Sequence, residues 1–296
     1  MCYDERSVVK GVRNVERQPA DKFVAVDDIE LHYVDWGGDG PPVVCVHGLT
    51  ANCRIWDALA EALAPRYRVL AIDLRGRGDS AKPARGYNIP VHAGDLLAFL
   101  DALQLQRPVV IGHSLGAMIT VFFASRYPTR PSKVVLVDGG VDPRPEVFDA
   151  IRPAIERLGV SYPSLADYFD FLRGMPFLAE WNGYMERFYG FDVAVAADGS
   201  VRPKVPKAAI EEEVASMRAG YQLREMYRWI RRPALILRAP DGLRGQDDCV
   251  LLPQEAAAMM RNMPNARLVE MSGTNHYTIL LGRRRAVAEA VLAFLG

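Results

Sequence analysis

The sequence lacks several features that mark membrane, nucleic-acid-binding or secreted proteins. No apolar run is long enough to cross a bilayer, and the first residues, MCYDERSVVKGVRNVERQ, are charged where a signal peptide is apolar. The 36 lysines and arginines balance 36 aspartates and glutamates, so no excess positive charge favours nucleic acid or an anionic membrane. We therefore expect a cytoplasmic protein that binds neither; the oligomeric state is left open.

Cysteines are also few, and their positions exclude several kinds of site. The 4 cysteines show no Cys-x-x-Cys spacing, and Cys45 lies inside the apolar run VVCV. This pattern favours isolated thiols in a reducing compartment over disulfides. No group of histidine, cysteine and acidic residues has the spacing of metal ligands, so we expect no metal and no cofactor.

The segment GRGDSA, residues 76–81, matches the G-x-G-x-x-A pattern of a dinucleotide site. That pattern requires a helix directly after it, whereas Lys82, Pro83 and Gly86 follow here. We therefore expect a structural turn, with Arg75 and Asp79 held by hydrogen bonds.

What the sequence does contain is a regular alternation of short β-branched runs and helical stretches. Continuous apolar runs are typical of strands covered on both faces. Strands that alternate with helices predict a mostly parallel sheet, and a hairpin around Asp27 and Asp28 is expected before it. The expected strands cover residues 43–46, 68–72, 109–111, 133–137, 234–237 and 266–271, and the expected helices cover residues 53–64, 92–103, 115–126, 254–262 and 283–295.

The alternation stops between about Val141 and Ile230, where aromatic residues and helical stretches occur without a convincing strand. Because the sheet needs the segments on both sides, this region is predicted to be an insertion rather than a tail domain. The expected organisation is a flexible N-terminal arm over residues 1–20, a core over 21–140 and 231–296, and a helical cap over 141–230. Some of the cap's aromatic residues are expected to line an apolar pocket.

A serine between two glycines follows one of the expected strands. In VVIGHSLGAM, Gly112 and Gly116 flank Ser114 where a strand turns directly into a helix. The residue at such a turn takes a strained backbone conformation, and a β-carbon on either flanking residue would clash. In this context the G-x-S-x-G pattern predicts a nucleophilic serine.

A serine hydroxyl needs a general base, and the base needs an orienting acid. His276 lies in a loop after the last expected strand, and such loops meet at one edge of a parallel sheet. We therefore expect His276 to be the base for Ser114. His113 directly precedes the serine and is expected to point away from it. Structural roles are expected for the remaining histidines, His32, His47 and His92.

The segments HGL, DLRGRGDS and GHSLGA, followed by a late histidine, resemble the α/β-hydrolase fold superfamily from about residue 22 onward. The resemblance implies an eight-stranded, mostly parallel sheet flanked by helices, with a helical cap inserted after strand six. It also implies an oxyanion hole formed by the backbone N–H groups of Leu49 and Leu115.

The acid has more than one candidate. The family usually places it after strand seven, where the loop RAPDGLRGQDDCVLLP offers Asp241, Asp247 and Asp248. That loop departs from the common Gly-x-x-Asp form, because Ala239 stands at the position of the glycine. Related hydrolases place the acid after strand six, where Asp138 precedes two glycines that allow a sharp turn. We favour Asp138 and keep the other three as alternatives.

The expected function is that of a carboxylesterase, a serine hydrolase that cleaves a small ester through an acyl-enzyme. The small-molecule ester is then the expected partner. A lactonase, a C–C bond or amide hydrolase, and a cofactor-free haloperoxidase would use the same residues. A small-molecule receptor that retains the triad is the non-enzymatic alternative, and substrate turnover distinguishes the two.

Overall fold

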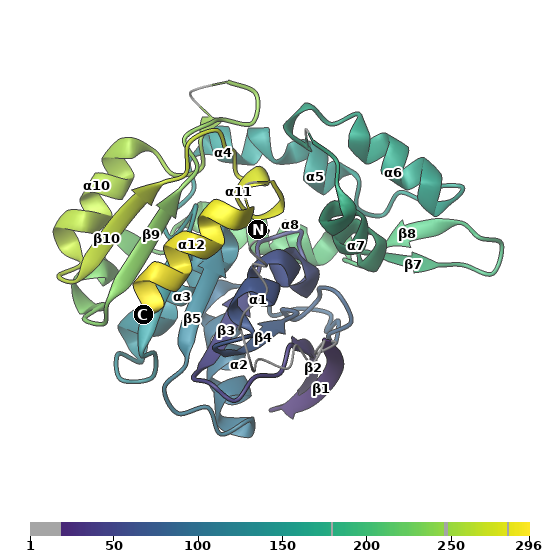
Figure 1. Ribbon diagram of the computed structural model, residues 1–296. Coiled ribbons are helices and arrows are strands. Elements are labelled where there is room, and N and C mark those ends of the chain that lie inside the picture. Colours follow the sequence, from purple (N-terminus) through teal and green to yellow (C-terminus); the bar gives the residue numbers. More distant parts are fainter. Residues whose placement is uncertain (1–18, 179, 246–247, 283) are drawn as a thin grey trace, which may run out of the picture.

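The computed structural model describes residues 19–178, 180–245, 248–282 and 284–296, and it contains an eight-stranded sheet between layers of helices (Figure 1). The strand order is β1-β2-β4-β3-β5-β6-β9-β10. Strand β2 runs antiparallel to the other strands of the sheet, and the predicted α/β fold with a mostly parallel sheet is confirmed. The strands are β1 (Ala20–Val26), β2 (Ile29–Asp35), β3 (Pro42–Val46), β4 (Arg68–Ile72), β5 (Val109–His113), β6 (Lys133–Val137), β9 (Ala234–Arg238) and β10 (Ala266–Glu270).

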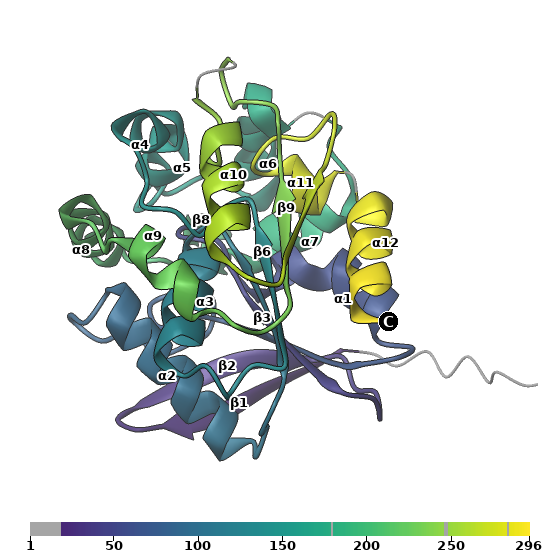
Figure 2. The ribbon, with the colours of Figure 1, turned by 90° about the vertical axis from the view of Figure 1, so that its left-hand side faces the viewer.

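Helices pack on both faces of the sheet, which explains the continuous apolar runs of its strands (Figure 2). Along β3, Val43 and Cys45 join the core under α1 and α12, whereas Val44 and Val46 join the core under α2, α3 and α10. The helices of these layers are η1 (Cys53–Trp56), α1 (Asp57–Leu63), α2 (Ile89–Ala102), α3 (Leu115–Arg126), α10 (Pro253–Asn262), α11 (Thr278–Leu281) and α12 (Arg284–Leu295). The expected N-terminal arm falls almost wholly on residues 1–18, outside the described residues.

The chain leaves the sheet after β6 and returns at β9, which pairs directly with β6. Helices α4 to α7 lie above the end of the sheet toward which the parallel strands run (Figure 1). The division into core and cap stays a prediction. The elements of this segment are α4 (Pro145–Ala150), α5 (Arg152–Glu156), α6 (Leu165–Arg173), η2 (Pro176–Leu178), α7 (Gly183–Phe191), β7 (Val193–Val195), β8 (Val201–Pro203), α8 (Lys207–Ala219), α9 (Leu223–Met226) and η3 (Tyr227–Trp229).

The short hairpin of β7 and β8 corrects the expectation that this segment has no strand. Each strand has 3 residues, too few for an alternating pattern to stand out. The turn signal is present, because Asp198 precedes Gly199, whose φ of 84° is readily adopted by glycine.

The turn at residues 76–81 is held by side chains on both sides, as predicted. Arg75 forms two hydrogen bonds of 2.6 Å to Asp95. Asp79 accepts a hydrogen bond of 2.7 Å from Lys204, and its N–H donates to the carboxylate of Asp73. The predicted hydrogen bonding of Arg75 and Asp79 is therefore confirmed.

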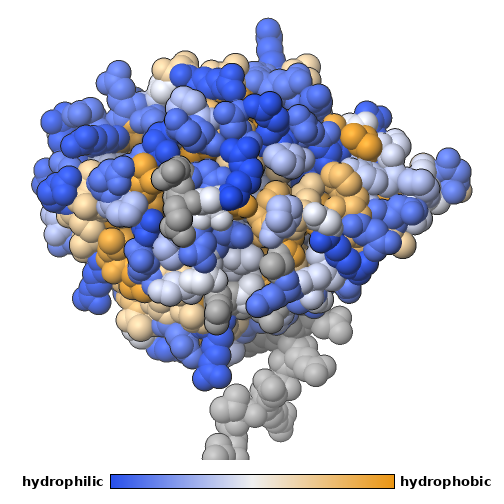
Figure 3. Space-filling model, turned by 90° about the horizontal axis from the view of Figure 1, so that it is seen from above, coloured by the Kyte–Doolittle hydropathy of each residue, from blue (hydrophilic) through white to orange (hydrophobic). Residues whose placement is uncertain are grey.

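Cys45, Cys53 and Cys249 are buried thiols, and Cys2 lies outside the described residues. Within the described ranges, no helix has the length and apolar character needed to span a bilayer. Seen from above, the molecule presents a mainly hydrophilic face with smaller apolar areas (Figure 3).

Candidate active site

Ser114 occupies a strained turn between β5 and α3. Its φ of 56° and ψ of −120° fall outside the regions that non-glycine residues ordinarily adopt. A β-carbon on Gly112 would overlap the carbonyl of Gly116, and one on Gly116 would overlap the carbonyl of Val46. The two glycines therefore let the turn pack against itself and against β3, and they hold the hydroxyl of Ser114 at the edge of the sheet.

The structure brings Ser114, His276 and Asp138 together from three separate parts of the chain. Nε2 of His276 lies 2.9 Å from Oγ of Ser114, and Nδ1 lies 2.8 Å from Oδ2 of Asp138. Oδ1 of Asp138 accepts the N–H of Ala239 at 3.1 Å. Asp138 has a φ of 42°, and a β-carbon on Gly139 would lie 2.7 Å from the carbonyl oxygen of Ser114. The glycine after Asp138 therefore permits this close approach.

The hydrogen bonds define the protonation of the His276 ring. A carboxylate only accepts, so Nδ1–H donates to Asp138 and the lone pair of Nε2 faces the hydroxyl of Ser114. In this tautomer the imidazole can remove the proton of Ser114, and Asp138 can stabilise the imidazolium that forms. His276 is 5% exposed and Asp138 is 1% exposed, so both groups are shielded from water.

The alternative acids in the loop after β9 make other contacts. Asp241 donates its N–H to the carbonyl of Thr274. The carboxylate of Asp248 accepts the backbone N–H groups of Arg244 and Gly245 at 2.9 and 3.2 Å. Asp247 lies outside the described residues. Asp138 is the candidate that the structure places against Nδ1 of His276.

His113 contacts His276, an interaction that the sequence does not predict. Its ring stacks on that of His276 with centroids 4.6 Å apart, and its Nε2–H donates to the carbonyl of His276 at 2.9 Å. It also lines a cavity together with Ser114. Burial lowers the pKa of His113 well below its ordinary value, so its ring is a neutral support. Alternation along a strand does not reveal this contact, because it depends on the loop after β10.

Leu49 and Leu115, whose N–H groups are the predicted oxyanion donors, line a cavity beside Ser114. Among the described residues, the N–H groups of Leu49 and Leu115 have no hydrogen-bond acceptor. Leu115 is the first residue of α3, so its N–H has no acceptor within the helix. Leu49, Leu115 and Ser114 line the same cavity. These two N–H groups are the donors of the predicted oxyanion hole.

His47 orients the peptide that carries the N–H of Leu49. Its Nε2 accepts the N–H of Leu74 at 3.0 Å, so its Nδ1 bears the proton and donates to the carbonyl of Gly48 at 2.8 Å. In a trans peptide the C=O of Gly48 and the N–H of Leu49 point in opposite directions. The predicted structural role of His47 is therefore specific: its ring turns the N–H of Leu49 away from itself.

Two cavities meet at Ser114 and His276. The first has an aromatic and polar lining, whereas the second is lined mainly by aliphatic side chains and Phe148. A substrate with groups on both sides of a carbonyl would place one group in each cavity. The first cavity includes Thr50, Arg157, Phe177, Phe188, Tyr189 and Tyr277, and the second includes Met118, Val141, Val147, Phe148, Met217 and Val250.

The first cavity contains a cation that is already neutralised. Arg157 is 3% exposed, forms an ion pair with the buried Asp192, and donates to Tyr168 at 2.6 Å. By contrast, the hydroxyls of Tyr189 and Tyr277 have no hydrogen-bond partner in the described part of the chain. The cavity therefore offers the hydroxyls of two tyrosines, and its arginine is already paired.

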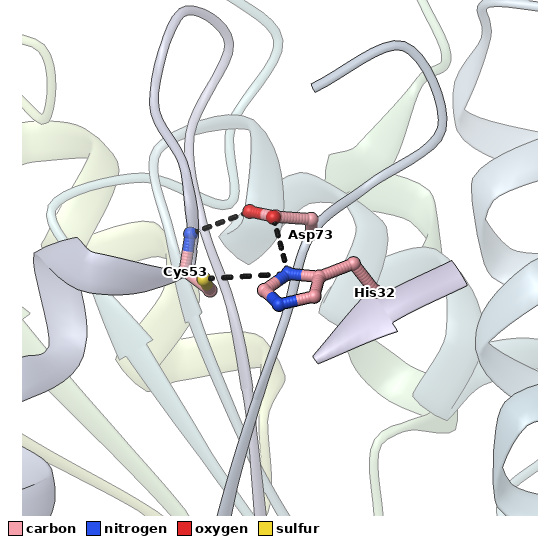
Figure 4. A group of neighbouring side chains, drawn as sticks. All are labelled: His32, Cys53 and Asp73. Atoms are coloured by element: carbon pink, nitrogen blue, oxygen red, sulfur yellow. Dashed lines mark hydrogen bonds and ion pairs between the residues drawn. The ribbon is translucent and has the colours of Figure 1, made fainter. Parts of the chain in front are cut away.

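A second group of chemically active side chains comes from β2, η1 and the loop after β4 (Figure 4). The ligand atoms of His32, Cys53 and Asp73 lie within 4.8 Å of one another. Asp73 accepts His32 Nδ1–H and the N–H of Cys53, both at 2.7 Å, and Nε2 of His32 faces Asp21 at 3.1 Å. Burial and the charge of Asp73 raise the pKa of the Cys53 thiol well above its ordinary value. A protonated thiol and a histidine with two carboxylate partners suit a structural network better than a metal.

A family model that describes the alpha/beta hydrolase fold matches residues 41–282. The chain belongs to the alpha/beta hydrolase fold family. This α/β-hydrolase is 27% identical over 241 residues to 2-(acetamidomethylene)succinate hydrolase from Mesorhizobium japonicum, covering 81% of this chain and 83% of the relative. The resemblance stated from the sequence motifs is therefore confirmed.

Solved structures agree with this assignment. A crystal structure of E-2-(acetamidomethylene)succinate hydrolase covers 94% of this α/β-hydrolase and 99% of its own chain, with a TM-score of 0.83 and 24% identity. This likeness shows the fold. An alpha/beta hydrolase from Novosphingobium aromaticivorans covers 94% of this chain and 98% of its own, with a TM-score of 0.78 and 27% identity.

Proposed function

We propose that this α/β-hydrolase is a carboxylesterase that cleaves small, uncharged esters through an acyl-enzyme. The observation that carries the proposal is the hydrogen-bonded chain from Asp138 through His276 to Ser114, with links of 2.8 and 2.9 Å. Oγ of Ser114 attacks the ester carbonyl while Nε2 of His276 takes its proton. His276 then returns the proton to the leaving alcohol, and Asp138 holds the ring throughout.

The tetrahedral intermediate places a negative charge on the former carbonyl oxygen. The free N–H groups of Leu49 and Leu115 would donate to this oxygen, and such donors act most strongly on the charge that develops during attack. Water then takes the place of the alcohol, and His276 removes its proton as it attacks the acyl carbonyl. The second intermediate collapses by breaking its bond to Oγ of Ser114, which takes the proton back from His276, and the acid is released. Each step needs only groups that this chain supplies.

The charge of the site supports an uncharged substrate. The guanidinium of Arg157 is paired with Asp192, so a carboxylate on the substrate would be buried without a free cation. The hydroxyls of Tyr189 and Tyr277 would instead donate to a neutral acceptor, such as an ether or a second carbonyl oxygen. The relative from Mesorhizobium is named for a succinate, and we expect this chain to differ from it in that respect.

Amide cleavage is the second candidate, because the name of the same relative describes an acetamido compound. The two candidates share the nucleophile and the oxyanion hole. They differ in the leaving group, since an amine must be protonated by His276 before it departs. A matched ester and amide with the same acyl group would separate them through their kcat/KM values.

Turnover of p-nitrophenyl acetate, butyrate and octanoate by the wild type and Ser114→Ala tests the proposal. We expect the short esters to be favoured, activity to be lost in Ser114→Ala, and a phosphonate inhibitor to label Ser114 in a mass spectrum. Ser125→Ala is the matched control, because this serine lies on the same helix and its hydroxyl donates to the carbonyl of Phe122. A wild type no faster than Ser114→Ala on any ester or amide, with no labelling, would favour the receptor alternative.

A second experiment tests the charge preference. Esters whose acyl chains end in a methyl, a methoxy or a carboxylate group are compared with the wild type, Tyr189→Phe and Tyr277→Phe. We expect the carboxylate ester to be the poorest substrate, and the advantage of the methoxy ester to shrink in both variants. Tyr184→Phe serves as the control, because its hydroxyl bonds Glu61 on the outside of α7. A preference for the carboxylate ester would contradict the proposal.

A further inference from the structure

Arg77 is a fully buried arginine that directly contacts the candidate oxyanion loop. Its side chain is 0% exposed, and its Nε donates to the carbonyl of Leu49 at 3.1 Å. Its two terminal nitrogens donate to the carbonyl of Arg75 at 3.0 Å and to Oε2 of Glu213 at 2.6 Å. The same guanidinium therefore links the loop that carries Leu49 to a side chain on α8.

Glu213 completes the buried group from the segment between β6 and β9. It lies on α8 and is 0% exposed, and its Oε2 also accepts a hydrogen bond of 2.8 Å from Nε2–H of His92. Burial raises the pKa of Glu213, but the charges of His92 and Arg77 outweigh this effect and lower it to about 2. The carboxylate is therefore ionised at neutral pH, and it supplies the negative charge that a buried arginine requires.

We propose that Glu213 is a positioning residue for the oxyanion hole, acting through Arg77 on the carbonyl of Leu49. This inference rests on the proposed function, in which the N–H of Leu49 is one of the two oxyanion donors. His47 holds the carbonyl before Leu49, and Arg77 holds the carbonyl of Leu49 itself. With the peptide planes on both sides held, the backbone of Leu49 keeps one conformation.

The residues that fix the carbonyls on the two sides of Leu49 come from different parts of the chain, and one of them gives α8 a role in the reaction. His47 belongs to the loop itself, whereas Glu213 reaches Arg77 from 136 residues further along the chain. Without its carboxylate, the guanidinium would be a buried charge lacking its counter-ion, and it would shift toward other acceptors. The N–H of Leu49 would then lose its fixed direction even though no atom of the substrate touches Glu213.

Glu213→Gln tests this role, because it keeps the shape of the side chain and removes its charge. Asp95→Asn is the matched control. Asp95 accepts two hydrogen bonds of 2.6 Å from Arg75, an arginine of the same turn as Arg77, and it does not contact the loop of Leu49. Losing one oxyanion donor outright costs about 10²–10³ in kcat, and we expect a misplaced donor to cost roughly tenfold. KM is expected to stay unchanged in Glu213→Gln, and kcat to stay unchanged in Asp95→Asn.

The affinity for a boronic acid inhibitor distinguishes a positioning role of Glu213 from a purely structural one. It forms a tetrahedral adduct on a nucleophilic serine, so its inhibition constant should weaken in Glu213→Gln by the same factor as kcat. Both variants are expected to lower the melting temperature. The proposal is overturned if Glu213→Gln only lowers the melting temperature and keeps the kcat and boronate affinity of the wild type.

Hydrogen–deuterium exchange separates this inference from the proposed function. Faster exchange of a peptide covering residues 47–52 is expected in Glu213→Gln and not in Asp95→Asn. A wild type inactive on every ester would overturn the proposed function alone, because the exchange measurement does not need turnover. Unchanged exchange in Glu213→Gln would overturn the positioning role whatever the activity.

Discussion

Gly112 and Gly116 lie against each other across the turn that carries Ser114. The space between them is so small that a β-carbon on Gly112 would overlap the carbonyl of Gly116 and lie close to the side chain of Thr120. Because the obstructing atoms belong to the backbone, they cannot move aside as a flexible side chain would. The turn therefore depends on glycine at this position.

Gly112→Ala is expected to disrupt the turn. The added methyl must push β5 away from α3, which we expect to destabilise the fold by about 2 kcal/mol or more and to reduce kcat strongly. Gly94→Ala is the matched control, because a β-carbon on Gly94 in α2 meets no atom within 4 Å. Denaturant unfolding and esterase rates check both variants, and equal behaviour of the two would contradict the packing argument.

Asp138→Asn is expected to lower kcat by about 10⁴-fold, as the loss of an orienting carboxylate does in serine hydrolases. The amide that replaces the carboxylate can turn its NH₂ toward Nδ1 of His276 and favour the wrong tautomer. Asp248→Asn should leave kcat close to that of the wild type, because its carboxylate holds Arg244 and Gly245 instead. Steady-state kinetics decide the matter, and near-normal turnover by Asp138→Asn would move the acid to the loop after β9.

The stability of the fold should fall in acid because of His47. Burial lowers the pKa of this histidine from 6.5 to about 4, so between these values the unfolded chain binds a proton that the folded chain does not. The contribution of His47 to the free energy of unfolding should drop by about 3 kcal/mol as the pH falls from 6.5 to 4, and the buried His113, whose pKa is also lowered, should add to the drop. Denaturant unfolding across this range measures the drop. His47→Gln lacks the titrating group, so an equally steep pH dependence in that variant would refute this origin.

The contribution of His32 to the stability of the fold should change with pH in the opposite direction. Burial lowers the pKa of His32, but hydrogen bonds and charges from Asp73 and Asp21 outweigh it and raise the pKa above 6.5. This contribution to stability is full below pH 6.5 and is lost as the pH rises through the raised pKa. NMR titration of the His32 ring, with His32→Asn as the unfolding control, checks the direction. A folded-state pKa below 6.5 would show that burial dominates instead.

The sheet was predictable because its signals are local. The run KVVLV predicts the strand at residues 133–137, and β6 covers the same residues. Ser114 and His276 were also predictable, since the first has a local glycine pattern and the second follows the last strand. The acid was harder to predict: Asp138 and Asp241 both follow strands, and the choice depends on which loop reaches Nδ1 of His276 in space.

Other features of the site left no signal in the sequence. The contact between Arg77 and Glu213 joins residues 136 positions apart, and the charges of both are common in solvent-exposed helices and turns. The stacking of His113 on His276 likewise depends on how the loop after β10 folds back. Such contacts are set by packing between elements, which periodicity along one element does not encode.

The pairing of β6 with β9 has a consequence for how this protein diversifies. Because β6 and β9 are neighbouring parallel strands, the long excursion between them leaves the carboxyl end of β6 and returns to the amino end of β9. Since the two flanking strands are adjacent in the sheet, recombination between homologues can exchange the whole excursion and change substrate range without altering the strand order. A replacement segment that lacks a carboxylate at the position of Glu213 would leave the guanidinium of Arg77 buried without a counter-ion. The sheet can therefore accept different segments between β6 and β9, provided that each one supplies a negative charge to Arg77.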